Sequence, residues 1–375
     1  MAKLGLPSIT IAFTSTGITA IERSQRGIIA LVLKEIKVAA ADGVAGNAAL
    51  FTGAPYTVYT TTDIPDGLTD ANKEQIELSL MGYQTAPKHI LVYVQDVAAK
   101  NYDDVLVELE HARFDYLVIP EIKDAEVTTI ATWIKGMRTV KDKMVKAVLP
   151  NCPADFEGVV NFTNTKVVTK AKTYTTAEYC SRIAGIICGT PMTISCTFAP
   201  LPEVIDCDKY TKDQMDSKIG NGELFIMFDG SKFKIARGVN SFITTIQGKG
   251  DQFKKIKLID LMDMIHDDIK DTANESYIGK YANSYDNKCL LISAIQGYFM
   301  QLEIDGLLEK NQNDCYLDLD NTAAWILSNG KKTKAEIAAM KTQELKEFNT
   351  QDKVFLSATI SMLDAIEDIK LGIKI

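Results

Sequence analysis

The segment that decides the fold spans residues 89–119 and has the sequence HILVYVQDVAAKNYDDVLVELEHARFDYLVI. Its two ends, residues 89–95 and 114–119, are short apolar runs of strand length, and Pro120 ends the second run. Between them, residues 102–113 place apolar side chains at the spacing of an amphipathic helix. A strand, a helix and a second strand in this order predict two parallel strands joined by a right-handed helical crossover.

The same alternation continues on both sides of this segment. Because each crossover helix must pack on a face of the sheet, the repeated pattern predicts the α/β class, with a mostly parallel sheet covered by helices. Further strands are expected at residues 27–38, 143–149 and 158–162, and further helices at residues 72–83, 127–140 and 176–188.

The pattern changes after about residue 195. Asp229-Gly230 is a turn pair between two short apolar runs, which predicts an antiparallel hairpin. Antiparallel strands are expected at residues 222–228, 232–235 and 241–246, helices at residues 253–271, 290–308 and 333–348, and a short strand at residues 315–319. The chain is therefore expected to be α+β overall, in four parts. These are an N-terminal arm (residues 1–20), an α/β domain (21–200), a C-terminal α+β domain (201–365) and a C-terminal arm (366–375).

Composition and charge place the chain among ordinary globular proteins. It has 375 residues, of which 46% are hydrophobic and 24% are charged. The net charge of −8 argues against a general nucleic-acid binder, which would carry a basic face. No stretch reaches the roughly 18 apolar residues that span a bilayer, and the N-terminus has no leader pattern. We therefore expect a protein made in a cytoplasm that neither inserts into a membrane nor binds nucleic acid directly.

No catalytic motif stands out. The sequence lacks a nucleophile elbow, a metalloprotease motif, a phosphate-binding loop and a dinucleotide fingerprint. The seven cysteines form no CxxC pair, so reduced and mostly buried thiols are expected. We therefore expect no enzyme, no cofactor and no metal.

The three histidines do not change this expectation. His89 and His111 fall in a predicted strand and a predicted helix, where a structural or surface role is expected. His266 lies among five aspartates, and a divalent-metal site is conceivable there. We favour a solvated acidic face, because hard cations need oxygens that converge from several elements. The aspartates that share this helix face are Asp260, Asp263, Asp267 and Asp271.

Both ends of the chain carry strand-like segments. Residues 369–375, IKLGIKI, alternate apolar residues with Lys or Gly, and residues 6–13, LPSITIAF, show a matching sided pattern. An unpaired apolar strand edge invites association. These strands must therefore pair inside the molecule or join sheets in neighbouring copies, which would make the chain a polymer subunit. The apolar faces comprise Ile9, Ile11 and Phe13 at one end and Ile369, Leu371, Ile373 and Ile375 at the other.

Several stretches, taken together and in order, resemble phage tail sheath proteins. They begin with residues 6–13 and end with residues 364–375, DAIEDIKLGIKI, so the resemblance covers essentially the whole chain. The chain is most similar in type to the compact sheaths of myophages, defective prophages and R-type bacteriocins of Gram-positive bacteria. The intervening stretches are AIERSQRGIIALVLK (20–34), AGIICGTPMTISCTFAPLPEV (184–204), RGVNSFIT (237–244), KKIKLIDLMDMIHDDI (254–269) and YIGKYANSYDNK (277–288).

The resemblance implies a structural role. Sheath subunits of this family stack as hexameric rings around an inner tail tube, with the α/β part outside and the C-terminal domain near the tube. Contraction drives the tube through the target cell envelope. The arms of each subunit add strands to a sheet in neighbouring subunits, which assigns the two terminal apolar faces to strand exchange. Further implied partners are the baseplate and the tail terminator. The implied location is a virion tail or phage-tail-like particle, assembled in the host bacterial cytoplasm.

The tube-facing element is expected in the charged helix at residues 333–348, through Lys334, Lys341 and Lys346. A solvated helix explains these lysines equally well. Two other functions stay open from the sequence. One is a soluble α/β enzyme whose terminal strands pair internally, and the other is a different structural protein of a tail or secretion system.

Overall fold

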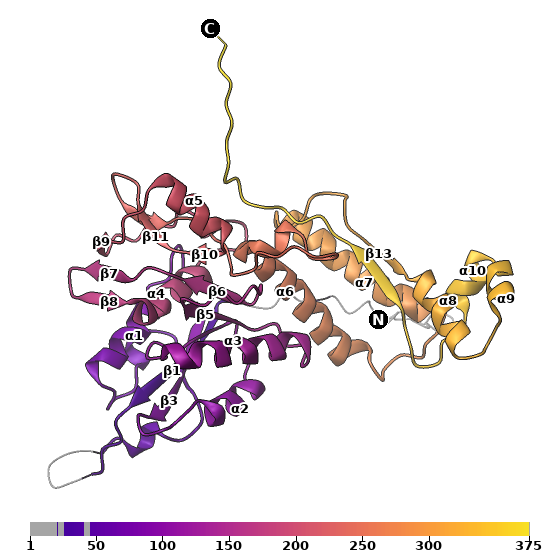
Figure 1. Cartoon of the computed structure of the whole chain (residues 1–375). Coiled ribbons are helices and arrows are strands. Elements are labelled where there is room, and N and C mark those ends of the chain that lie inside the picture. The colour runs from indigo at the N-terminus through magenta and orange to yellow at the C-terminus, as the bar shows by residue number, and fades with distance from the viewer. Residues whose placement is uncertain (1–20, 22–25, 41–45, 375) are drawn as a thin grey trace, which may run out of the picture. The chain divides into compact units, whose positions relative to one another are not determined.

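The computed structural model describes residue 21, residues 26–40 and residues 46–374. Within these residues, no helix has the length and apolar character that crossing a membrane would require. The chain forms two compact units (Figure 1). Of the described residues, the sheet unit comprises residues 26–40, 46–268 and 362–374, and the helical unit comprises residues 269–361 with residue 21. The expected division into arms, an outer domain and an inner domain stays a prediction.

The sheet unit is built on a seven-stranded sheet with the strand order β10-β6-β5-β4-β1-β3-β2. Neighbouring strands are parallel except β2, which runs antiparallel to β3. The predicted α/β class with a mostly parallel sheet is confirmed. The strands are β1 (Ile28–Glu35), β2 (Tyr56–Val58), β3 (His89–Asp96), β4 (Tyr116–Val118), β5 (Lys146–Pro150), β6 (Val159–Phe162) and β10 (Glu223–Leu224).

Strand β1 lies between β3 and β4, and all of its residues are buried. This burial on both faces explains why its sequence is a continuous apolar run and not an alternating one. Successive side chains of a strand point to opposite faces, so alternate residues of β1 enter two separate cores. Ile29, Leu31 and Leu33 pack in one core, and Ile28, Ala30 and Val32 pack in the other.

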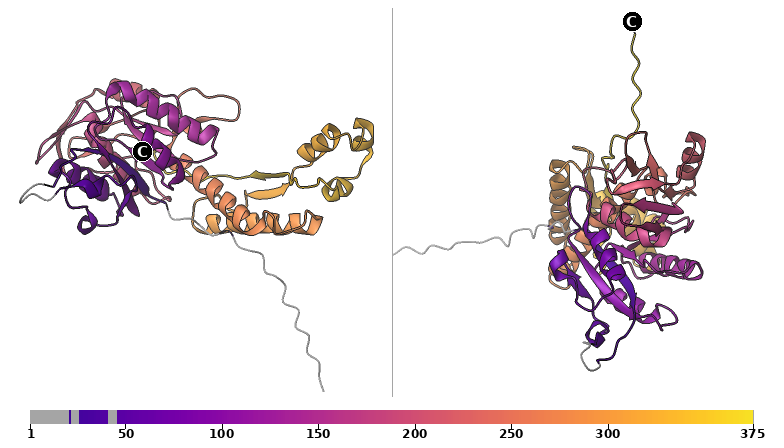
Figure 2. Two further views of the ribbon diagram at one scale, coloured as in Figure 1. Left: turned by 90° about the horizontal axis from the view of Figure 1, so that it is seen from below. Right: turned by 90° about the vertical axis from the view of Figure 1, so that its left-hand side faces the viewer.

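Two pairs of helices cover the two faces of the sheet (Figures 1 and 2). Ile76 of α1 and Ile183 of α4 belong to the first core, while Leu109 of α2 and Ile134 of α3 belong to the second. The crossover helices therefore lie on both faces, as the strand–helix alternation predicts. These helices are α1 (Asp70–Leu80), α2 (Asp103–His111), α3 (Asp124–Thr139) and α4 (Thr176–Cys188).

Smaller elements complete the sheet unit. The hairpin predicted at Asp229-Gly230 is confirmed, because β11 and β12 pair antiparallel on either side of this turn. The strand predicted at residues 241–246 is wrong, since that segment has only an isolated bridge between Ile246 and Lys249. The elements are β7 (Lys166–Thr169), β8 (Thr173–Thr175), β9 (Val204–Cys207), β11 (Ile226–Phe228), β12 (Phe233–Ile235), α5 (Lys212–Gly220), α6 (Ile256–Thr272) and 3-10 turns at Ala48–Leu50, Thr61–Asp63 and Asp251–Lys254. The unit boundary falls within α6, after Asp268.

The helical unit contains α7 and a two-stranded antiparallel sheet of β13 and β14. The single helix predicted at residues 333–348 is wrong, because the segment forms two short helices. The Glu344 side chain accepts a hydrogen bond from the Lys341 amide and so begins the second helix. The elements are a π-helical turn (Ala273–Tyr277), α7 (Tyr285–Ile304), β13 (Asp314–Leu317), α8 (Leu319–Ser328), α9 (Lys334–Ala339), α10 (Thr342–Glu347) and β14 (Leu356–Thr359).

Candidate functional site

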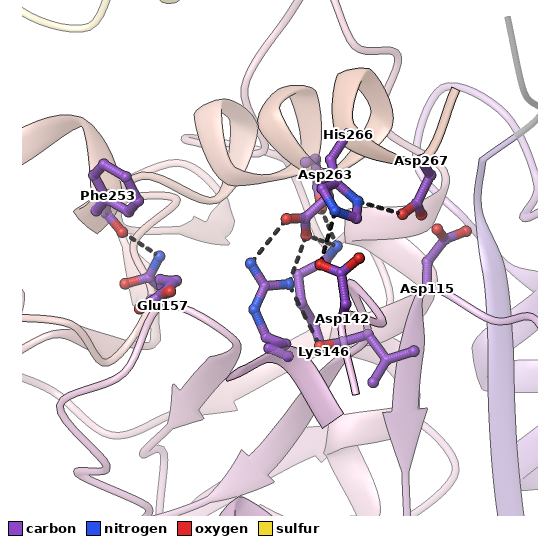
Figure 3. Close-up of polar contacts among 12 residues, drawn as sticks. Asp115, Asp142, Lys146, Glu157, Phe253, Asp263, His266 and Asp267 are labelled. Carbon is purple, nitrogen blue, oxygen red and sulfur yellow. Dashed lines mark hydrogen bonds and ion pairs between the residues drawn. The ribbon is translucent and has the colours of Figure 1, made fainter. Parts of the chain in front are cut away.

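The acidic face of α6 is not solvated, and the prediction that it is solvated is wrong. Asp263 is buried, and its two carboxylate oxygens each accept a hydrogen bond of 2.8 Å from Arg138 of α3. The same carboxylate accepts a hydrogen bond of 2.6 Å from the buried ammonium group of Lys146, the first residue of β5 (Figure 3). Burial raises the pKa of Asp263, but Lys146 and Arg138 outweigh burial and hold this pKa below its usual value.

The remaining acidic groups of this face are paired as well. Asp260 accepts a hydrogen bond of 2.8 Å from the Tyr116 hydroxyl and lies 3.1 Å from Lys146 Nζ. Arg26 bridges Asp267 at 2.8 Å and Asp115 at 2.7 Å. Buried charges are stable only when they are paired and hydrogen-bonded. We call the group of Arg26, Asp115, Arg138, Lys146, Asp260, Asp263 and Asp267 the ionic cluster.

His266 extends this network to the loop before β5. Its Nδ1 lies 2.9 Å from Asp267 Oδ1, and its Nε2 lies 3.0 Å from Asp142 Oδ1 (Figure 3). The hydrogen bond to Asp267, together with Asp142, raises the pKa of His266. A structural ion-pairing role accounts for this histidine. In the part of the chain that the structure describes, no group of three His, Cys, Asp or Glu residues could hold a metal ion.

Replacing Asp263 by alanine should lower the free energy of unfolding of the full chain by about 3–5 kcal/mol, because it leaves Arg138 and Lys146 buried without their counterion. Urea unfolding followed by circular dichroism measures the change. Asp216→Asn, at an exposed position of α5, is the matched control and should change stability by less than about 0.5 kcal/mol. Equal effects of the two substitutions would show that the ionic cluster does not stabilise the fold.

The contribution of His266 should depend on pH. Its folded-state pKa is raised, so its stabilisation is fully present below the unfolded-state value of about 6.5 and is lost as the pH rises through the folded-state pKa. The difference in melting temperature between the wild type and His266→Gln should therefore be largest at acidic pH and shrink toward alkaline pH. Thr132→Ser, at an exposed position of α3 that does not titrate, serves as control and should give no such trend. A difference that stays constant with pH would contradict this role.

The C-terminal strand segment has no partner within the described chain. Residues 369–374 belong to no helix or strand, and the side chains of Ile369, Leu371 and Ile373 are 80%, 80% and 77% exposed. Figure 1 and the right-hand view of Figure 2 both show this segment as an extended trace that leaves the sheet unit. Internal pairing, which the enzyme hypothesis requires, is therefore not what these residues do. Ile375 and the N-terminal residues Ile9, Ile11 and Phe13 lie outside the described residues.

The residues just before this segment are held on the sheet unit by charges. Glu367 Oε1 accepts hydrogen bonds from Thr197 Oγ1 at 2.5 Å and Ser195 Oγ at 3.1 Å. Glu367 Oε2 accepts from Arg237 Nε at 3.0 Å and Lys255 Nζ at 3.2 Å. We call Ser195, Thr197, Arg237 and Lys255 the carboxylate socket. The sequence reasoning did not identify this site, although the acidic run at Asp364, Glu367 and Asp368 directly before the strand pattern was a usable signal.

The β13–β14 sheet in the helical unit offers an edge for a further strand. Within the described residues it has two strands, so each has a single strand neighbour. Its buried side chains, Cys315 and Leu317, come from β13, which packs on α7. Gln296 of α7 donates a hydrogen bond of 3.1 Å to the Cys315 carbonyl, which partly covers the outer edge of β13. The outer edge of β14 is therefore the more suitable acceptor, and a two-stranded sheet is only marginally stable alone.

The three lysines expected to face a tube lie on or beside the short helices of the helical unit. Lys334 begins α9, Lys341 precedes α10 and Lys346 lies within α10. Lys334 and Lys341 are exposed, and Lys346 is half-buried. Their contact with a tube stays a prediction.

Family models identify the chain. The model of the phage tail sheath protein central domain matches residues 95–241, and the model of the phage tail sheath C-terminal domain matches residues 248–375. A tail sheath protein of Clostridium phage phiCD119 is 36% identical over 376 residues, which covers 99% of each chain. The chain therefore belongs to the phage tail sheath protein family, and the resemblance described from the sequence is confirmed.

Solved structures share the fold. The sheath tail protein from Desulfitobacterium hafniense has 18% sequence identity and a TM-score of 0.68 over 83% of this chain and 94% of its own. The helical sheath of the anti-feeding prophage in its contracted state has 14% identity and a TM-score of 0.69 over 99% of both chains. The mixed α/β architecture described above is thus that of tail sheath subunits.

Proposed function

We propose that this chain is the structural subunit of a contractile tail sheath, which polymerises as stacked hexameric rings around an inner tube and contracts to drive that tube through a target cell envelope. Membership of the tail sheath family and the shared fold with a contracted sheath support this proposal. The observation that carries it is the exposed apolar C-terminal arm, residues 369–374. The subunit acts by assembly and not by catalysis.

The arm has the chemistry of a donated strand. Its apolar side chains alternate with Lys370, Gly372 and Lys374, so one face can enter a neighbour's core while the other stays in water. A strand over residues 369–375 would form about five ladder hydrogen bonds, each contributing about 1 kcal/mol net. Burying each apolar side chain would add roughly 1.5 kcal/mol, before the cost of ordering the arm. Ordering the arm offsets much of this sum, so both the ladder and the apolar face are needed for the arm to bind.

The acceptor on the neighbouring copy is the β13–β14 sheet. Strand addition at β14 would enlarge a marginal two-stranded sheet and bring the arm's apolar face to the side that packs on α7. N-terminal residues Ile9, Ile11 and Phe13 would contribute a second donated strand. Because donor and acceptor are different surfaces of one chain, the contact is head-to-tail and generates rings or open helices.

The remaining assignments follow from this assembly. Residues 21–200 form the outer α/β domain, and residues 201–365 form the inner, lattice-forming domain. The inner tube contacts the helical unit through Lys334, Lys341 and Lys346. The baseplate and the tail terminator bind the two ends of the sheath. The particle assembles in the host bacterial cytoplasm and becomes part of a virion tail or a phage-tail-like particle.

Deleting residues 369–375 should leave a folded protein that cannot polymerise, because the deletion removes the donated strand and, among its described residues, nothing that packs in either core. Negative-stain electron microscopy of the purified protein shows whether tubes form, and circular dichroism checks folding. Long tubes formed by the truncated chain would refute strand donation.

A matched pair of point variants tests the sided pattern of the arm. Leu371→Asp places a charge on the apolar face and should abolish tubes, whereas Lys370→Gln changes the solvent face and should leave them intact. Loss of tubes in both variants would mean that the charge of the arm, and not its apolar face, drives assembly.

Charge reversal tests the tube contact. The triple variant Lys334→Glu, Lys341→Glu and Lys346→Glu should reduce co-sedimentation of the sheath with its tube by about tenfold or more at low salt, because attraction to an acidic tube becomes repulsion. Sheath tubes formed without an inner tube should be unaffected. Lys100→Glu, an exposed lysine after β3, is the control. Normal tube binding by the triple variant would place the tube contact elsewhere.

A further inference from the structure

We propose that Glu367 is the positioning residue of the C-terminal arm: its capture by the carboxylate socket fixes where the free arm begins and so sets how far the donated strand can reach. This inference rests on the proposed strand donation. It deepens that proposal by assigning the start of the arm to one ionic contact.

Charged groups, and not apolar packing, attach residues 362–368 to the sheet unit. We call these residues the root of the arm. The side chain of Glu367 is 7% exposed, whereas Ile366 and Ile369 on either side are 87% and 80% exposed. Lys257 Nζ donates a hydrogen bond of 2.6 Å to the Leu363 carbonyl, and Lys255 also pairs with Asp364. The only deeply buried carboxylate of residues 362–368 is that of Glu367, and its contacts therefore dominate this attachment.

Two members of the socket, Ser195 and Thr197, are also held by hydrogen bonds that do not involve Glu367. The Gly238 amide donates a hydrogen bond of 2.9 Å to Thr197 Oγ1, and the Thr197 amide donates one of 3.1 Å to Ser195 Oγ. A side chain at Gly238 would place its Cβ only 2.9 Å from Cys196 Sγ and 3.0 Å from Ser195 Oγ, so the close approach requires glycine. Donors already fixed by the fold bind a carboxylate with little loss of freedom.

The charge state of Glu367 agrees with this geometry. Burial raises its pKa, but Thr197, Lys255 and Arg237 outweigh burial and hold the pKa below the usual value. The carboxylate is therefore ionised at neutral pH and bound through charge-assisted hydrogen bonds, which are stronger than neutral ones. Asp368, in contrast, is 77% exposed and touches only the rim of the socket through Arg237.

The position of this contact determines the length of the tether. With Glu367 held, the free arm is residues 369–375 and spans at most about 25 Å, at roughly 3.3–3.6 Å per residue. When Glu367 is released and the contacts of Lys257 with Leu363 and of Lys255 with Asp364 open with it, the free segment extends back to about Met362 and its reach is roughly doubled. The effective concentration of the arm at its acceptor falls roughly as the −3/2 power of tether length, or about threefold for a doubling. A short tether also restricts the spacing between subunits.

Substitution of Glu367 in the full-length chain tests the inference. Glu367→Ala should raise the concentration needed for tube formation about threefold and broaden the axial spacing of rings in electron micrographs. Glu367→Gln keeps the shape of the side chain but removes its charge, and it should also raise the concentration needed for tube formation. This variant keeps the test valid if the alanine variant misfolds. Asp368→Asn is the matched control and should behave as wild type, because its carboxylate is exposed.

Limited chymotrypsin digestion of the unassembled protein supplies a second measurement. Release of the root should make the chain at Leu363 sensitive to cleavage in both Glu367 variants, but not in the wild type or in Asp368→Asn. A merely destabilised fold would instead be cleaved throughout the sheet unit.

The outcomes separate this inference from the proposed function. If deletion of residues 369–375 prevents tubes but both Glu367 variants assemble at the wild-type concentration and spacing, strand donation stands and the positioning role is wrong. Weaker assembly without new cleavage at Leu363 would also overturn it, because the root would still be attached. Tube formation by the deleted chain would reject strand donation itself.

Discussion

The buried pairing of Asp263 with Arg138 and Lys146 is the constraint on which the sheet unit depends. A carboxylate, a guanidinium group and an ammonium group can lie together in a low-dielectric interior only if each satisfies the others. This requirement fixes the first turns of α6 against the start of β5 and against α3. Hydrophobic packing alone permits small shifts of a helix, whereas bidentate hydrogen bonds specify one position.

Polar and apolar groups are distributed unusually in this chain. The acidic face of α6 is buried in the ionic cluster, while Ile369, Leu371 and Ile373 of the arm are exposed. Buried charge and exposed apolar surface are the informative departures from the ordinary arrangement. The first gives the sheet unit a defined internal geometry, and the second is the surface that we propose enters a neighbouring copy. Both features suit a protein whose function is to occupy a place in an assembly.

The attachment of the arm combines two kinds of interaction. Charges hold its root at Glu367, and apolar side chains form its exposed end. Salt and pH act mainly on the root, because they change ionic contacts, whereas temperature acts mainly on the apolar end, since hydrophobic association weakens on cooling. The exposed end of the arm and its point of attachment are therefore stabilised by different interactions.

The sequence by itself determined the parallel sheet and the polarity of the arm, because both follow from local periodicity: the buried run of β1 and the alternation of residues 369–375. It did not determine the ionic cluster or the carboxylate socket. The partners of Asp263 come from residues 138 and 146, and those of Glu367 from residues 195, 197, 237 and 255. Helical spacing shows that the aspartates share a face, but it does not show which residues that face contacts. Only the tertiary structure brings these distant counterions together, and their proximity decides that the carboxylates are buried and paired and not solvated.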